Sequence, residues 1–157
     1  MSMPWWEKHI GYRLLLLHDK LYKATNGRIG HTIPGGPSAL ILHTVGAKTG
    51  QPRANSLTYA RDGDDYLVVA SMGGEPRAPG WYHNLKANPS VEINVGPKRL
   101  AVTARAVMPD DPEYPRLWEL VNNMRGNKGQ YIKYQKRTSR PIPVVVLTPI
   151  SRQAATP

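Results

Sequence analysis

The sequence predicts a mainly β fold with added helices, in which six antiparallel strands form a closed or split barrel. From residue 38 onward, short runs of β-branched and apolar residues alternate with turns containing glycine, proline or aspartate. The runs cover residues 39–45, 54–61, 66–71, 91–95, 99–107 and 143–148. Asp62-Gly63-Asp64-Asp65 and Gly96-Pro97-Lys98 are typical hairpin connections, so antiparallel pairing is expected. Fifteen prolines and fourteen glycines also favour many turns over long helices.

A helix is expected ahead of the barrel, at residues 4–25, because apolar residues recur there at helical spacing among basic ones. Trp5 and Trp6 near its start suit a helix that lies on an anionic membrane, although most such helices pack on their own domain. Glycines and prolines in residues 26–37 end it. The predicted organisation is therefore a helix and linker at 1–37, one barrel domain at 38–150 and a tail at 151–157.

Three further helical segments are expected within the barrel domain. A single helical turn lies between Trp81 and Lys86, a helix covers residues 111–124, and a basic segment that bears tyrosines covers 128–137. Tyr131 and Tyr134 are spaced i, i+3, so they share one face of the last helix.

Composition excludes several kinds of site. The chain has no cysteine, which rules out disulfides, thiolate metal ligands and cysteine nucleophiles. Its five histidines show no HExxH or other paired metal spacing, so no metal site is expected. Redox chemistry would therefore need a bound organic cofactor. A length of 157 residues and 40% hydrophobic content fit one domain with a sizeable core.

The net charge of +10 favours an anionic partner, which could be nucleic acid, anionic lipid or a polyanionic cofactor. A merely solvated basic surface is the simpler explanation for the run that contains Arg125, Lys128, Lys133, Lys136, Arg137 and Arg140. No nucleic-acid-binding motif accompanies the charge, so nucleic acid is not expected. The leucines at 14–17 are too few for a signal peptide or a membrane span. A cytoplasmic protein is the default expectation, with peripheral contact at the inner face of the membrane left open.

The stretch Gly46-Ala47-Lys48-Thr49-Gly50-Gln51-Pro52-Arg53 places two cations and a hydroxyl in a tight turn. Backbone N–H groups in such a turn can face a phosphate. The stretch is not a Walker loop, because its lysine precedes the second glycine and a strand follows instead of a helix. A plain hairpin connection with solvated cations is the alternative.

Two more motifs follow this turn. Ser71-Met72-Gly73-Gly74 ends an apolar strand, and Pro79-Gly80-Trp81-Tyr82-His83-Asn84-Leu85 comes after it. Together the three motifs combine cations, amides and aromatic rings, which is the outline of a site for a flat ligand with an anionic group.

These residues resemble the deazaflavin-dependent nitroreductase family, whose small actinobacterial-type members bind the 5-deazaflavin coenzyme F-420. The resemblance covers about residues 38–147 and rests on GAKTGQPR, YARDGDDYLVVASMGG and PGWYHNLKANP in the family's order. It implies a split β-barrel and a reduced deazaflavin that donates hydride to quinones, nitro compounds or activated enones.

The motifs and the resemblance together define an expected coenzyme site. Lys48 and Arg53 are expected at the phosphate, with Arg77 as a secondary cation. The family often has proline and tyrosine where Ser56 and Thr58 stand, and the resemblance places this polar pair along the ring. The full set is Lys48, Thr49, Arg53, Asn55, Ser56, Thr58, Ser71, Met72, Gly73, Arg77, Trp81, Tyr82 and Asn84. Relatives often have a basic residue where this chain has Met72. Simple core packing is the alternative role for Trp81.

Ser71, Tyr131 and Tyr134 are the expected catalytic residues. The two tyrosines resemble the family's substrate-site tyrosines, and Ser71 lies where the motif brings a hydroxyl near the ring. Packing of their helix on the barrel is an equally good explanation for the tyrosines. His83 is not expected to act as an acid, because a lone histidine in a structural turn is more often part of the scaffold.

The expected function is therefore F-420-dependent reduction of a hydrophobic, electron-poor acceptor such as a quinone, by a monomer or weak dimer. Two alternatives keep the fold. One is a reductase that uses FMN, which also presents a phosphate and a tricyclic ring. The other is a protein that binds deazaflavin without turnover.

Overall fold

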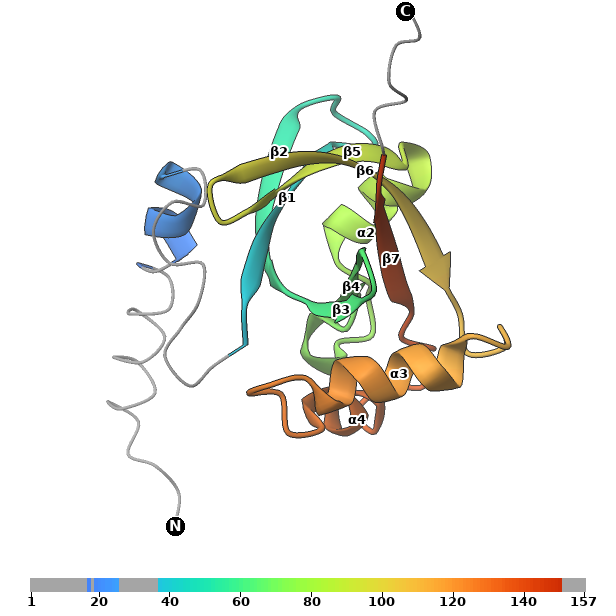
Figure 1. Ribbon diagram of the computed structural model, residues 1–157. Coiled ribbons are helices and arrows are strands. Elements are labelled where there is room, and N and C mark those ends of the chain that lie inside the picture. Colours follow the sequence, from blue (N-terminus) through green and yellow to red (C-terminus); the bar gives the residue numbers. More distant parts are fainter. Residues whose placement is uncertain (1–16, 18, 26–36, 151–157) are drawn as a thin grey trace, which may run out of the picture.

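A single curled sheet dominates the computed structural model, which describes residue 17, residues 19–25 and residues 37–150 (Figure 1). The sheet is antiparallel with seven strands in the order β2-β1-β5-β6-β7-β4-β3. The strands are β1 (Ala39–Val45), β2 (Pro52–Thr58), β3 (Ala60–Asp62), β4 (Asp65–Val69), β5 (Ser90–Val95), β6 (Lys98–Val107) and β7 (Val144–Pro149). The helical segments are η1 (Met72–Gly74), α2 (Gly80–Ala87), α3 (Tyr114–Asn123) and α4 (Gln130–Gln135).

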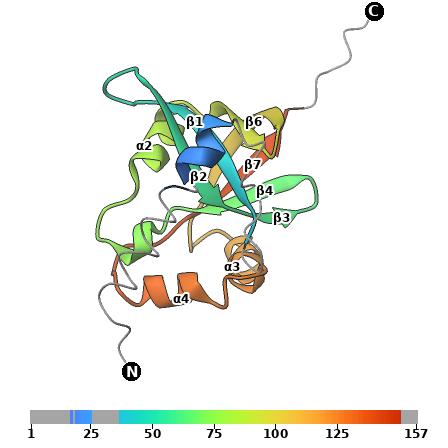
Figure 2. The ribbon, with the colours of Figure 1, turned by 90° about the vertical axis from the view of Figure 1, so that its left-hand side faces the viewer.

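The predicted fold class is confirmed, but the predicted strand count of six is wrong. The run expected at 54–61 forms two strands, because the chain bends at Tyr59, whose N–H donates to the Ser38 carbonyl at 3.1 Å. The strands on either side of this bend, β2 and β3, are the two edges of the sheet. The bend therefore joins one edge to the other, and it curls the sheet into a half-barrel (Figures 1 and 2).

Both predicted hairpin connections are present. Asp62 pairs with Asp65 around a turn in which Gly63 has a φ of 58°, and Val95 pairs with Lys98 around Gly96 and Pro97. The predicted helical turn near residues 81–86 is the eight-residue helix α2. The helices expected at 111–124 and 128–137 are the shorter α3 and α4.

Two buried clusters lie on opposite faces of β4 and β7. Tyr66 and Val68 pack toward α2 inside the curl, whereas Leu67 and Val69 pack toward α3 and α4. Such alternation is the normal pattern of a strand that is covered on both faces. The helix α2 therefore fills the inside of the curled sheet, and α3 and α4 cover the outside near one end (Figure 1).

The N-terminal helix is described only from residue 17, with residue 18 left out. Residues 17 and 19–24 are helical. Tyr22 is fully buried against Ala39 and Ile41, and its hydroxyl donates to the Ala39 carbonyl at 2.7 Å. This end of the predicted helix thus packs on its own domain. Trp5 and Trp6 lie outside the described residues, so the membrane contact expected from them stays a prediction. None of the helices in the described part of the chain is long and apolar enough to cross a membrane.

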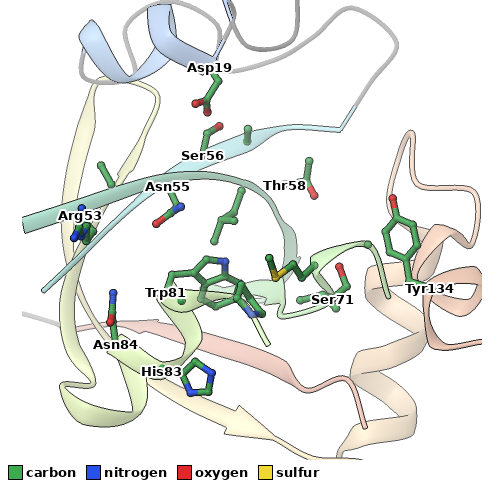
Figure 3. A pocket seen from close by; sticks show the side chains of 18 of the residues that line it. Asp19, Arg53, Asn55, Ser56, Thr58, Ser71, Trp81, His83, Asn84 and Tyr134 are labelled. Atoms are coloured by element: carbon green, nitrogen blue, oxygen red, sulfur yellow. The ribbon is translucent and has the colours of Figure 1, made fainter. Parts of the chain in front are cut away.

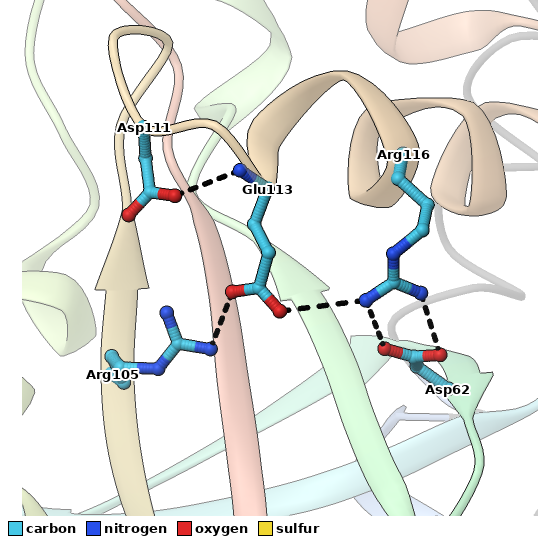
Figure 4. A network of polar contacts seen from close by, with 5 residues as sticks. All are labelled: Asp62, Arg105, Asp111, Glu113 and Arg116. Carbon is cyan, nitrogen blue, oxygen red and sulfur yellow. Dashed lines mark hydrogen bonds and ion pairs between the residues drawn. The ribbon is translucent and has the colours of Figure 1, made fainter.

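Ion pairs tie the start of α3 to the sheet (Figure 4). Arg116 makes two 2.9 Å contacts with the Asp62 carboxylate on β3, and Arg105 on β6 contacts Glu113 at 2.9 Å. The Arg116 hydrogen bonds hold the pKa of Asp62 below its usual value. The buried Tyr114 hydroxyl on α3 donates to the Ile142 carbonyl at 2.6 Å. Burial raises the pKa of Tyr114 to about 12. Because the exposed pairs stabilise little, buried side chains such as Tyr114 do most to fix α3.

Candidate functional site

A cleft of about 1230 Å³ opens along β2, the edge strand that carries the predicted site residues Arg53, Asn55, Ser56 and Thr58. Its walls come from the β1–β2 turn, β2, the segment after β4, the start of α2 and the helix α4. Figure 3 shows that Arg53 and Asn84 lie at one end and that Ser71 and Tyr134 lie at the other, with Trp81 between. The curl of the sheet thus brings three motifs that are separate in sequence to one site.

The β1–β2 turn is closed by its own backbone. Gly46 donates to the Gln51 carbonyl at 2.8 Å, and Gly50, with a φ of 66°, donates to the Gly46 carbonyl at 2.9 Å. Lys48 lies within this closed turn and Arg53 follows it on β2, and both residues are exposed. Neither has an ion-pair partner among the described residues. The turn therefore presents two uncompensated cations to the cleft.

Asn84 anchors this turn from α2. Its side-chain oxygen accepts the Ala47 N–H at 2.9 Å, and its amide nitrogen donates to the Thr44 hydroxyl at 3.1 Å. One N–H of the amide stays available to a ligand, since the group carries two donors. The position of Lys48 and Arg53 thus depends on a residue of the PGWYHNL motif.

Trp81 forms the wall in the middle of the cleft. It is 6% exposed and meets Tyr82 edge to face, with ring centroids 6.4 Å apart. A flat indole wall suits a planar ligand, and the same ring belongs to the inner hydrophobic core. Its two expected roles, ring wall and core packing, are therefore combined in one side chain.

The two tyrosines predicted as catalytic close the far end. Tyr131 is buried and shares a 3.0 Å hydrogen bond with the Thr58 hydroxyl on β2. Burial raises the pKa of Tyr131; the Thr58 contact opposes that rise and Tyr134 adds to it. The half-buried Tyr134 accepts a hydrogen bond from the Gln130 side chain, and its ring lies 6.2 Å from that of Tyr131. Both side chains thus bring a phenolic hydroxyl, which can donate or accept a hydrogen bond, to this end of the cleft.

Most of the predicted site residues come together in this cleft. Those that line it are Lys48, Thr49, Arg53, Asn55, Ser56, Thr58, Ser71, Met72, Gly73, Trp81, Asn84, Tyr131 and Tyr134. Arg77 is exposed and does not line it. Tyr82 is buried behind Trp81 and contacts the Met108 sulfur at 3.9 Å.

Three other polar side chains in the cleft wall were not predicted as site residues. Asp19 reaches it from the N-terminal helix and pairs with Lys23 at 2.7 Å. Gln130 and His83 also line it. No local pattern marks Asp19 as a site residue, since its place follows from the packing of Tyr22 on β1. Gln130 could have been found from its i, i+4 spacing to Tyr134.

A family model described as F420H(2)-dependent quinone reductase matches residues 14–149. The chain belongs to this family. Membership confirms the resemblance expected from the sequence, and coenzyme F-420 is the cofactor that the family name carries.

Relatives and solved structures agree with this membership. The chain is 69% identical over 144 residues to an F420H(2)-dependent quinone reductase of Mycobacterium tuberculosis. The matched region covers 92% of this chain and 95% of that protein. A solved F420-H2 dependent reductase is 36% identical, with a TM-score of 0.60 over 69% of this chain and 92% of its own. A second structure, described as a domain-swapped dimer, is 32% identical, with a TM-score of 0.63 over 90% of this chain and 96% of its own. The expected monomer or weak dimer stays a prediction for this family member.

Proposed function

We propose that this chain binds reduced coenzyme F-420 in the cleft along β2 and passes a hydride to a quinone held in the same cleft. One observation supports it most. The β1–β2 turn and Arg53 bring two cations to one end of the cleft, neither of them ion-paired within the described residues, and the Ser71 and Tyr134 hydroxyls lie at the other end, where Tyr131 contacts Tyr134. A deazaflavin needs cations for its anionic tail and hydrogen-bond donors beside its ring. The family membership supports the same assignment.

The residues present fit this coenzyme in charge and in size. Lys48 and Arg53 suit its phosphate, because an ammonium and a guanidinium give charge-assisted hydrogen bonds. Trp81 and Leu57 offer apolar surface to the ring. A volume of about 1230 Å³ exceeds the roughly 300–1,000 Å³ typical of a pocket for one small ligand, which leaves room for an acceptor.

When bound, the reduced coenzyme supplies the hydride, so the protein needs no nucleophile of its own. The side chains fix distance and orientation and exclude water. A quinone that gains a hydride has gained two electrons and one proton, so one oxygen stays anionic until a second proton arrives. Tyr131 and Tyr134, which line the cleft, would donate hydrogen bonds to that oxygen. Nitro compounds and activated enones are further acceptors to screen, because they also develop an oxyanion.

Coenzyme titration tests the proposal directly. The folded protein is titrated with oxidised F-420 and, separately, with FMN, and binding is followed by the change in coenzyme fluorescence. We expect tight binding of F-420 and weak binding of FMN, followed by oxidation of reduced F-420 when a quinone is added. Binding of FMN alone would contradict the choice of coenzyme, and binding of F-420 without turnover of any acceptor would contradict the enzyme assignment.

Replacing Tyr134 with phenylalanine is expected to slow quinone reduction about tenfold while the affinity for F-420 stays the same. The hydroxyl would act only as charge develops on the acceptor, and loss of such a contact lowers kcat more than binding. Tyr131→Phe also breaks the Thr58 contact, so Thr58→Val is the matched control for that bond. Stopped-flow oxidation of reduced F-420 measures the rates. Full turnover in both tyrosine variants would make these residues packing groups.

A further inference from the structure

The segment after β4 has a backbone shape that gathers N–H groups on one side. Ser71 has right-handed helical angles (φ −82°, ψ −35°), and the next residue, Met72, has a φ of 44° in the left-handed region. In such a right-then-left pair, three successive N–H groups converge to form an anion-binding concavity. Here they belong to Ser71, Met72 and Gly73, all of which line the cleft. Within the described chain these three N–H groups have no acceptor.

The Ser71 side chain adds a fourth donor beside them. The residue is 7% exposed, and its hydroxyl makes no hydrogen bond to any described residue, yet it lies at the cleft (Figure 3). The hydroxyl oxygen itself is accessible from the cleft, because no fully buried side-chain oxygen or nitrogen among the described residues lacks a partner. It can therefore donate to a ligand oxygen that also accepts from the three converging N–H groups.

Arg140 lies behind this segment and bonds to its carbonyl groups. One terminal nitrogen of its guanidinium donates to the Ala70 carbonyl at 3.2 Å and to the Ser71 carbonyl at 3.0 Å, and Nε donates to the Glu75 carbonyl at 3.0 Å. The first two carbonyls belong to the peptide groups that carry the Ser71 and Met72 N–H. Hydrogen bonds in a chain polarise one another, so a cation at the carbonyl strengthens the donor at the other end of the peptide.

Arg137 makes a similar contact with a different result. It donates to the Gly73 carbonyl at 3.3 Å, which belongs to the peptide group of the Gly74 N–H. That N–H already donates to the Ser71 carbonyl at 2.9 Å and takes no part in the concavity. Arg137 is therefore a matched comparison, because it bonds to the same segment but to a peptide group whose N–H does not take part in the concavity.

We propose that the Ser71, Met72 and Gly73 N–H groups and the Ser71 hydroxyl bind an oxygen that carries negative charge, and that Arg140 is the positioning residue that holds and polarises them. The phosphate position proposed at Lys48 and Arg53 is separate from this concavity, because Arg53 and Ser71 lie at opposite ends of the cleft. The oxygen that we expect there belongs to a ring carbonyl that gains negative charge, as the oxygen of an enolate does.

Two ligands of the proposed function carry such an oxygen, and the choice of ligand rests on that function. One is the coenzyme ring, whose carbonyl edge gains electron density in the reduced state. The other is the quinone, whose oxygen stays anionic after hydride arrives and before the proton does. Donors that are already oriented stabilise either anion without reorganisation.

The experiment uses 2-hydroxy-1,4-naphthoquinone, an acid whose anion is coloured, with neutral 1,4-naphthoquinone as its matched probe. Absorbance against pH gives the pKa of the bound hydroxyquinone in the parent, Arg140→Gln, Arg140→Lys and Arg137→Gln. A separate fluorescence titration gives the affinity of each protein for oxidised and for reduced F-420. Circular dichroism checks folding, and Arg140→Lys, which keeps the charge, serves if Arg140→Gln does not fold.

If the quinone oxygen occupies the concavity, the pKa of the bound probe falls in the parent and rises by about one unit in Arg140→Gln, which is a tenfold weaker hold on the anion. Arg140→Lys restores part of the shift, and Arg137→Gln behaves as the parent. If the coenzyme oxygen occupies it, the affinity for reduced F-420 falls about tenfold in Arg140→Gln while the probe keeps its pKa.

Three results would overturn the proposal. The first is parent-like behaviour of both probes and of the coenzyme in a folded Arg140 variant. The second is an equal effect of Arg137→Gln. The third is an equal loss of affinity for the neutral and for the anionic quinone in Arg140→Gln, which would mean that Arg140 only shapes the cleft. Failure of the parent to bind F-420 would instead contradict the proposed function, and the probe measurements would still test the concavity.

Discussion

Replacing Gly74 with alanine is expected to lower the free energy of unfolding by roughly 2–4 kcal/mol, a large effect for one methyl group. Gly74 has a φ of 83°, where side chains are strained. A Cβ there would also lie 2.5 Å from the Tyr134 carbonyl oxygen and 2.9 Å from the Arg137 Cβ. Neither contact involves the flexible end of a side chain, so the end of α4 would have to move away.

Gly63→Ala is the matched control, because Gly63 has a φ of 58° but open space around its Cα. It is expected to cost about 1 kcal/mol, the price of the left-handed conformation alone. Urea titrations followed by tryptophan fluorescence measure both values. Equal losses for the two variants would mean that α4 can shift without cost.

A displaced α4 should also disturb the cleft. Tyr131 and Tyr134 lie on this helix, and Tyr131 reaches Thr58 across the cleft. In Gly74→Ala the quinone reaction should therefore slow even at temperatures where the protein stays folded. The segment after β4 and the tyrosine helix are thus one packed unit on which the far end of the cleft depends.

Local pattern was enough to predict most strands and both tight hairpins, because each depends on residues close in sequence. The strand break at Tyr59 was missed, since residues 54–61 contain no glycine or internal proline to mark a bend. The bend follows from a contact with Ser38 and from the closing of the sheet. A tertiary constraint of this kind has no local signal.

The same distinction holds within the cleft. The GAKTGQPR turn and the tyrosine pair could be predicted because each motif carries its own chemistry. Arg140 could not, since it looked like one more solvated cation in a basic run. Its role depends on carbonyls some 70 positions earlier in the chain, at Ala70 and Ser71. Asn84 was predicted as a site residue from its motif, but its anchoring of the β1–β2 turn was not, because its contacts with Thr44 and Ala47 form only once α2 lies against β1.

Replacing Arg53 with alanine is expected to weaken F-420 binding by about 1.5–3 kcal/mol, or roughly 10- to 150-fold. Arg53 is paired with Thr44 in the sheet register, so its backbone is fixed next to the turn that Asn84 anchors. Its guanidinium has no ion-pair partner in the described part of the chain, so its charge is available to an anionic ligand.

Arg53→Lys and Arg77→Ala are the comparison variants for this measurement. Lysine keeps the charge but loses the paired hydrogen bonds, so it should recover only part of the affinity. Arg77 lies outside the cleft, so its loss should act only through long-range charge and should vanish at high salt. Fluorescence titration at two salt concentrations separates these effects. An unchanged dissociation constant in folded Arg53→Ala would move the phosphate away from the β1–β2 turn, and equal losses for Arg53→Ala and Arg77→Ala would reduce the role of the turn to net charge.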